Sequence, residues 1–130
     1  MNTLWKMPLC SAGRASDSVW QLPGRDVEVA VSDGDELGGV PSERLIFGGV
    51  ESFRVTYHRS CTPDMSDAYD RVIELSETAW LVEVRVQLLG ANEPTDSLRH
   101  LRLYLDDGPC YEFICGRFRA EASEHRTPIA

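Results

Sequence analysis

The feature that most constrains the fold is a pair of alternating segments in the C-terminal half of the chain. Leu101, Leu103 and Leu105 alternate with polar residues, which gives an extended segment one apolar and one polar face. The turn-forming run Asp-Asp-Gly-Pro at 106–109 follows at once. Residues 110–115 then continue with aromatic and β-branched side chains. The two segments and the turn between them predict a β-hairpin.

Three further strands are indicated closer to the N-terminus. Residues 26–31 alternate valine with polar or small residues, which is the period of a half-buried strand. Residues 44–47 and 53–58 predict two more strands, and Gly48-Gly49 between them predicts a tight turn. Residues 32–42 are rich in Asp, Gly and Pro and predict a loop. Because short connections favour neighbouring antiparallel strands, we expect these three strands to pair in sequence order.

The middle of the chain carries two incompatible patterns. Apolar residues recur with helical spacing over 63–75, where a proline stands at the first helical position. In the alternative, residues 71–75 form a strand and Ser76 caps a helix over 77–88. Valines at every second position from 82 to 86 also match a strand. Periodicity alone leaves both interpretations open.

Length and composition indicate one domain. The chain has 130 residues, of which 42% are apolar and 26% charged, as in a globular domain with its own core. We expect residues 1–119 to form a single α+β domain and residues 120–130 to be a disordered tail. The sequence holds no apolar run long enough for a transmembrane helix, and residues 1–10 lack the apolar stretch of a signal peptide. These patterns predict a cytoplasmic protein that does not contact membranes.

The charge balance restricts the class of partner. Thirteen Lys and Arg against 21 Asp and Glu give a formal charge of −8. Such a charge repels nucleic acid and favours a basic protein partner. The glycine pairs at 38–39 and 48–49 lack the Lys-Ser/Thr of a phosphate-binding loop. We expect no nucleic-acid and no nucleotide binding.

The cysteines suggest packing rather than chemistry. The chain has four, Cys10, Cys61, Cys110 and Cys115. In a reducing compartment we expect free thiols, with Cys110 and Cys115 in the core. Cys61 stands near His58 and Arg59, whose charge would favour thiolate, so we expect it to react at least as fast as Cys10. Zinc binding by His58 and the cysteines is disfavoured, because residues 110 and 115 point to opposite faces of a strand. We expect no metal and no cofactor.

Polar side chains on the hairpin are the candidate site. His100, Arg102, Tyr104 and Glu112 share or adjoin one hairpin face, and this mixture suits recognition of a protein partner. The alternative is a catalytic centre made of Glu112, Cys110 and His100. That alternative requires Glu112 and His100 to lie on the same face of the sheet and to converge in a cleft.

Three segments together resemble a known group of proteins. They are Gly49-Val50-Glu51-Ser52-Phe53-Arg54, Ser76-Glu77-Thr78-Ala79-Trp80-Leu81, and the run from Arg99 to Glu112. The chain resembles, over residues 45–118, small bacterial proteins with a strand-rich fold, some of which resemble immunity proteins of toxin systems. The resemblance implies that the Ser-x-x-x-Trp-Leu segment opens a helix, which favours the strand at 71–75 and the helix at 77–88.

These observations combine into one prediction of fold and function. We expect an α+β domain, a mainly antiparallel sheet of about five or six strands, with one helix packed on it through Trp80, Leu81 and Val84. The expected function is that of a non-enzymatic protein-binding module, an immunity-like inhibitor of a basic toxin, and the alternative is a small hydrolase or transferase. The predicted core consists of Val29, Val31, Phe53, Val55, Trp80, Leu101, Leu103, Phe113 and Ile114.

Overall fold

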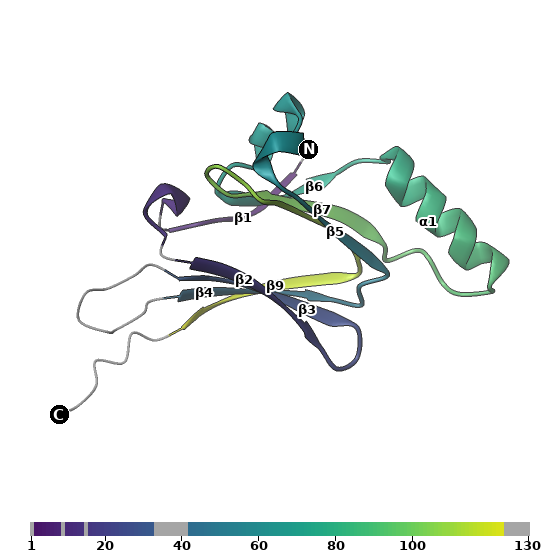
Figure 1. Ribbon diagram of the computed structural model, residues 1–130. Coiled ribbons are helices and arrows are strands. Elements are labelled where there is room, and N and C mark those ends of the chain that lie inside the picture. The colour runs from purple at the N-terminus through teal and green to yellow at the C-terminus, as the bar shows by residue number, and fades with distance from the viewer. Residues whose placement is uncertain (1, 9, 15, 33–41, 124–130) are drawn as a thin grey trace.

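The protein is a sandwich of two antiparallel sheets with one α-helix against the outer face of the first (Figure 1). The computed structural model describes residues 2–8, 10–14, 16–32 and 42–123. The first sheet has the strand order β1-β6-β7-β8-β5 and the second β2-β3-β4-β9. The elements in chain order are β1 (Asn2–Lys6), η1 (Ser11–Gly13), β2 (Ser16–Leu22), β3 (Asp26–Ser32), β4 (Ser42–Gly48), β5 (Ser52–Thr56), η2 (His58–Ser60), η3 (Pro63–Ala68), β6 (Arg71–Leu75), α1 (Ala79–Gly90), β7 (Arg99–Tyr104), β8 (Cys110–Cys115) and β9 (Arg117–Ser123), where η marks a short 3-10 helix.

The strand-rich, mainly antiparallel architecture with one packed helix is confirmed, but the prediction of a single sheet is wrong. The chain changes sheet three times, from β1 to β2, from β4 to β5 and from β8 to β9, and the last two changes occur at glycine. Gly48 and Gly49 separate β4, which pairs with β9, from β5, which pairs with β8. Gly116 separates β8 from β9 in the same way. The Gly116 N–H donates to the Gly48 carbonyl at 3.0 Å, so the two crossings lie side by side. The expected pairing of the strand at 53–58 with the strand at 44–47 is therefore wrong.

Most of the predicted elements are present. The C-terminal hairpin is confirmed as β7 and β8, and the strand at 71–75 is confirmed as β6. The helix begins at Ala79, and Thr78 rather than Ser76 caps it, because the Thr78 side chain accepts a hydrogen bond from the Leu81 N–H. Strands β1 and β2 were not predicted. Strand β9 continues through residues 120–123, although the sequence predicts the tail to begin at residue 120, and residues 124–130 lie outside the described part of the chain.

The core lies between the sheets and is centred on two phenylalanines. The rings of Phe47 and Phe113 stack with centroids 3.8 Å apart. Around them the valines of β3 and the leucines of β4 and β7 are almost fully buried. Six of the nine predicted core residues are buried, whereas Phe53, Val55 and Trp80 are only partly so. The register places every second residue of β7 and β8 in this core and leaves the others on the outer face of the first sheet.

Helical segments cover part of that outer face. Leu81 and Val84 of α1 pack against Leu98 and Ile114 at one end of the sheet. The short helix η3 contacts β7 at the other end and buries Met65 there. Among the described residues, no helix is long and apolar enough to cross a membrane. The polar residues of the hairpin therefore lie between two helical covers.

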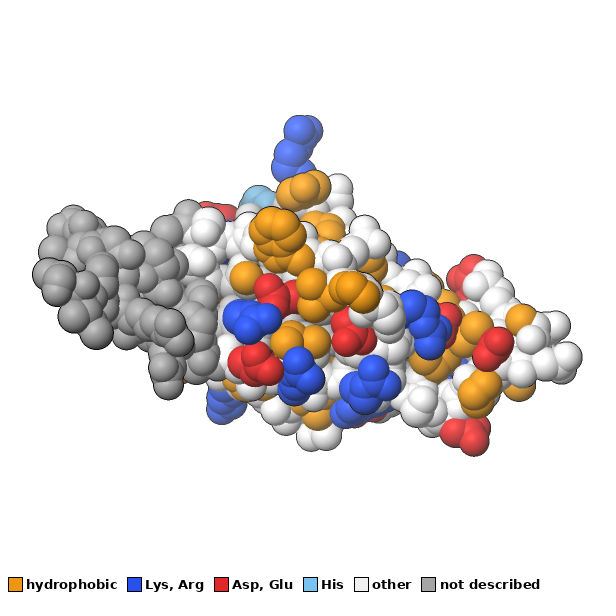
Figure 2. Space-filling view, turned by 90° about the horizontal axis from the view of Figure 1, so that it is seen from below, with side chains coloured by type: hydrophobic (Ala, Val, Ile, Leu, Met, Phe, Trp, Pro, Cys, Tyr) orange, Lys and Arg blue, Asp and Glu red, His pale blue; other side chains and the backbone are white. Residues whose placement is uncertain are grey.

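The outer face of the second sheet differs in character (Figure 2). Arginine and acidic side chains alternate across it, and Arg44 pairs with Glu28 at 2.6 Å and with Glu121 at 3.3 Å. Exposed ion pairs of this kind contribute little to stability. They give this face a mixed charge.

Candidate functional site

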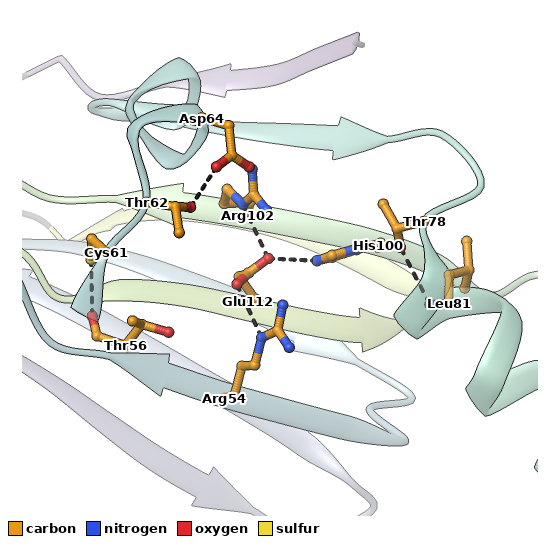
Figure 3. Close-up of polar contacts among 10 residues, drawn as sticks. All are labelled: Arg54, Thr56, Cys61, Thr62, Asp64, Thr78, Leu81, His100, Arg102 and Glu112. Atoms are coloured by element: carbon orange, nitrogen blue, oxygen red, sulfur yellow. Dashed lines mark hydrogen bonds and ion pairs between the residues drawn. The ribbon is translucent and has the colours of Figure 1, made fainter.

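Three of the four predicted site residues come together on the outer face of the first sheet (Figure 3). Arg102 on β7 lies directly opposite Glu112 on β8, and His100 lies one pair further along the same face. The requirement that His100 and Glu112 share a face is met. Tyr104 lies on the same face but beside Tyr69, with ring centroids 6.4 Å apart, and takes no part in the cluster.

The Glu112 carboxylate is the centre of the cluster. It is fully buried, and its two oxygens accept hydrogen bonds from three cationic or imidazole side chains. One oxygen accepts from His100 Nε2 at 2.7 Å and from Arg102 Nε at 3.0 Å, and the other from Arg54 Nε at 3.1 Å. A buried carboxylate is tolerated only when it is paired and hydrogen-bonded in this way.

The surroundings of Glu112 keep it ionised. Burial by itself would raise the pKa of its carboxyl group. The hydrogen bonds from His100 and Arg54 and the positive charges of Arg102 and Arg54 outweigh burial and lower the pKa to about 2. Glu112 therefore carries its charge at every physiological pH and acts only as an acceptor.

The cluster continues into the N-terminus of α1. His100 Nδ1 lies 2.7 Å from Thr78 Oγ1, the same oxygen that accepts the Leu81 N–H at 3.3 Å. Because ionised Glu112 can only accept, the proton of a neutral His100 ring resides on Nε2, and the Thr78 hydroxyl donates to Nδ1. One chain of hydrogen bonds thus joins the helix cap to the buried carboxylate.

Trp80 closes the cluster from above. Its ring meets the His100 ring edge-on, with centroids 5.1 Å apart. The Arg54 guanidinium lies over the Trp80 ring at 4.2 Å, a cation–π contact. At the other end Arg102 Nη1 donates to Asp64 on η3 at 3.4 Å. The cluster therefore ties β5, β7 and β8 to both of the helical covers.

The order Thr78, His100, Glu112 resembles a nucleophile, a base and an orienting acid. Two observations speak for a positioning role instead. The Thr78 oxygen is engaged as the cap of α1, and the clefts on either side of α1 are lined by other residues. Burial also raises the pKa of the Cys110 thiol to about 12, so that thiol is not activated. The geometry serves to hold α1 on the sheet.

The two cysteines expected to be buried are buried, whereas the surroundings of Cys61 oppose the expected activation of its thiol. Its sulfur donates to the Thr56 carbonyl at 3.4 Å, and burial raises the pKa of its thiol. Cys110 shares the outer face with Glu112, and Cys115 lies in the core between the sheets, as their opposite parity predicts. Within the described ranges no group of three or more His, Cys, Asp or Glu side chains is arranged to hold a metal ion.

Sequence reasoning missed Arg54, Thr78 and Trp80 as members of the cluster. Arg54 faces Glu112 only because β5 pairs with β8, a contact between residues 58 positions apart. Thr78 stands directly before the first residue of the helix, and Thr is a preferred residue type at this N-cap position. The sequence could therefore have indicated its role as the cap. Trp80 was expected to pack on the sheet, and it does so through His100.

The helix that the cluster holds presents an unusual outer face. Helix α1 is apolar on both sides. Its outer side carries Val82, Val86 and Leu89, which are 44%, 63% and 62% exposed. We call these three residues the α1 crest. Their spacing places them in one stripe along the helix.

Acidic clefts flank the α1 crest. One cleft of about 430 Å³ is lined by Glu74 and Glu77 together with Arg85, which pairs with Glu77. The other, of about 350 Å³, is lined by Glu51 and Glu83. In Figure 2, α1 lies at the right, where orange apolar and red acidic side chains are interspersed. Three of these four carboxylates pair with arginine, Glu74 with Arg99, Glu77 with Arg85 and Glu51 with Arg25. The surface of α1 thus combines an apolar stripe with a border of paired charges in which Glu83 adds a further carboxylate.

No family model, curated protein sequence or solved structure matches this chain.

Proposed function

We propose that the protein is a non-enzymatic protein-binding module, an immunity-like inhibitor that holds a basic toxin through the α1 crest. The α1 crest is the observation that carries the proposal. A helix with apolar residues on both faces is normally covered on both, and here one face is open. A partner that covers Val82, Val86 and Leu89 would bury this apolar surface.

The excess of acidic over basic residues supports a basic partner. Glu74 and Glu77 border the α1 crest on one side, and Glu51 and Glu83 border it on the other. The chain as a whole carries a formal charge of −8. An apolar centre with a charged rim is the usual anatomy of a protein interface, and complementary rim charges accelerate association.

The buried cluster has a supporting part in this proposal. An exposed helix that contacts the sheet through one face needs a fixed position if it is to bind with little loss of entropy. The hydrogen bonds from Glu112 through His100 to Thr78 fix the first turn of α1 on the sheet. His100 and Glu112, which the sequence predicts as partner-binding residues, would therefore support α1 from below and would not touch the partner themselves.

An affinity experiment tests the proposal. Tagged wild-type protein and Val86→Lys are each exposed to an extract of the native cells, with Arg119→Ala on the exposed face of the second sheet as the matched control. Lysine favours helix more than valine does, so Val86→Lys keeps α1 folded while placing a positive charge on the α1 crest. We expect the wild type and Arg119→Ala to retain one basic protein in stoichiometric amount, and Val86→Lys to retain at least tenfold less.

The same experiment can contradict the proposal. Equal retention by Val86→Lys, or no stoichiometric partner for the wild type, would exclude the α1 crest as a binding surface. Retention should also weaken as salt rises, because the rim charges are solvent-exposed. A toxin gene directly upstream in the genome would support the assignment of the partner as a toxin.

The Thr78–His100–Glu112 chain of hydrogen bonds favours hydrolysis as the second candidate function. In that case Thr78 would be the nucleophile and His100 its base. A chromogenic short-chain ester then serves as probe. Hydrolysis by wild type and Thr78→Ser, and its loss in Thr78→Ala, would support the second candidate. Equal background rates in all three proteins are the result that our first proposal predicts.

A further inference from the structure

Two edge strands lie on the same side of the sandwich (Figure 1). Strand β2 ends one sheet and β5 ends the other, and neither pairs with a further strand among the described residues. Clefts of about 210 and 400 Å³ open between them. We call this region, residues 17–22 and 52–57, the β2/β5 seam.

The lining of the clefts shows how the two strands run. The smaller cleft joins Gln21 to Phe53, and the larger joins Val19 to Val55 and Tyr57. As the residue number rises along β5 it falls along β2, so the strands are antiparallel across the seam. Of these positions, Val19, Phe53 and Val55 pack against the core.

The larger cleft of the β2/β5 seam has an apolar floor, whereas the smaller cleft is also lined by Arg25, Asp26 and Glu51. Val19 and Val55 pack against the core but are only partly buried, and the Tyr111 ring lines the larger cleft. The one carboxylate in that cleft, Asp17, accepts from the Tyr111 hydroxyl and pairs with Arg14 at 3.0 Å. A ligand entering the seam would meet apolar side chains below and two strand edges at the sides.

Those edges are of the kind that native proteins usually protect. Proline or a bulge commonly blocks an exposed edge strand. Neither segment 16–22 nor segment 52–56 contains a proline, and each pairs with its neighbour in unbroken register. Their outward N–H and C=O groups are available to pair with another strand.

We propose that the β2/β5 seam binds an extended segment of a partner protein as an added strand, whose apolar side chains at every second position enter the seam. An added strand would pair with one of these edges at the ordinary strand spacing of about 4.8 Å, and every second side chain of it would then face the space between the sheets. Backbone pairing would supply affinity, and the apolar floor would select the alternating residues.

Exposed aromatic side chains flank the β2/β5 seam and suit such a ligand. Tyr57 is 73% exposed at one end of β5, and Trp20 is 59% exposed on β2. Tyrosine and tryptophan are the residue types that most often dominate binding energy at interfaces. The seam adjoins the cleft beside the α1 crest only at Ser52 and contains none of the crest residues, so this inference goes beyond the proposed function and can fail without it.

A phage library of random linear peptides is the probe. We expect the wild type to enrich peptides with apolar residues at alternate positions. Binding of a recovered peptide is then measured by fluorescence polarisation. We expect Val19→Lys to weaken binding at least tenfold and Tyr57→Ala severalfold, while Val86→Lys on α1 leaves it unchanged. The same peptide with N-methyl groups at alternate residues should bind at least tenfold more weakly, because it keeps the side chains and loses backbone pairing.

Several results would overturn the inference. One is that no peptide is enriched above empty beads. The others are that Val19→Lys and Tyr57→Ala bind the peptide as tightly as the wild type does, or that N-methylation leaves its affinity unchanged. Self-association of the wild type that Tyr57→Ala abolishes would show a second copy in the seam, and would replace the proposed partner. If Val19→Lys fails to fold, the exposed Tyr57→Ala and the N-methylated peptide still decide.

Discussion

Replacing Glu112 by glutamine should cost the protein a large and pH-dependent part of its stability. Glutamine keeps the shape of the side chain but removes the charge that His100, Arg102 and Arg54 surround. Two cationic side chains would then lie against a neutral amide, with Arg102 itself only 7% exposed. Removing one partner of a buried ion pair typically costs about 3–5 kcal/mol.

The pKa of Glu112 gives an independent value for the same loss. It falls from the ordinary 4.5 to about 2 in the folded protein. One pKa unit corresponds to about 1.4 kcal/mol, so ionisation of Glu112 favours the folded state by about 3 kcal/mol. Because the folded pKa is the lower one, this stabilisation is complete above pH 4.5 and is lost as the pH falls toward 2.

Urea denaturation of wild type and Glu112→Gln, followed by circular dichroism, measures the effect. At pH 6 we expect a difference in the free energy of unfolding of about 3 kcal/mol. At pH 3 the difference should shrink by about 2 kcal/mol, because unfolded Glu112 is then largely protonated. A difference below about 1 kcal/mol at pH 6, or one that does not change with pH, would refute the account of the cluster.

Further predictions concern the helix cap, the core and the thiols. Thr78→Ala should lower the free energy of unfolding by about 1–2 kcal/mol and reduce hydrogen-exchange protection in α1, whereas Thr78→Ser should keep most of both. Phe113→Ala should cost about 3–5 kcal/mol in urea titrations, because Phe113 is fully buried and stacked at the centre of the core. A chromogenic disulfide should label exposed Cys10 first and Cys61 more slowly, and should reach Cys110 only on unfolding. Labelling of Cys110 in native protein would show that the outer face of the sheet is open.

Local pattern accounts for the elements that could be predicted. The hairpin at 99–115 combines strict alternation with a strong turn, and such signals are carried by neighbouring residues. The division into two sheets depends on contacts between distant residues, such as the pairing of β4 with β9. The residues around Gly48-Gly49 do not indicate whether the following strand pairs with the preceding one or joins the other sheet. That choice is made by packing, here of Phe47 against Phe113.

The candidate site was predicted in part for the same reason. Parity along two adjacent strands places His100, Arg102 and Glu112 on one face, and the sequence shows this directly. Their burial depends on α1 and η3, which cover the face from elsewhere in the chain. Arg54 enters the cluster through a strand pairing that sequence order did not suggest. The sequence thus predicts that these three side chains share one face of the sheet, but not that they are buried there.

Hydrogen–deuterium exchange of the protein with and without its captured partner tests the central claim most directly. We predict that binding protects amides in residues 79–90, around the α1 crest, and in the acidic segments 51–52 and 74–77 beside it. Protection confined to β2 and residues 53–56 of β5, or to the outer face of the second sheet, would contradict the claim that α1 is the surface on which the partner binds.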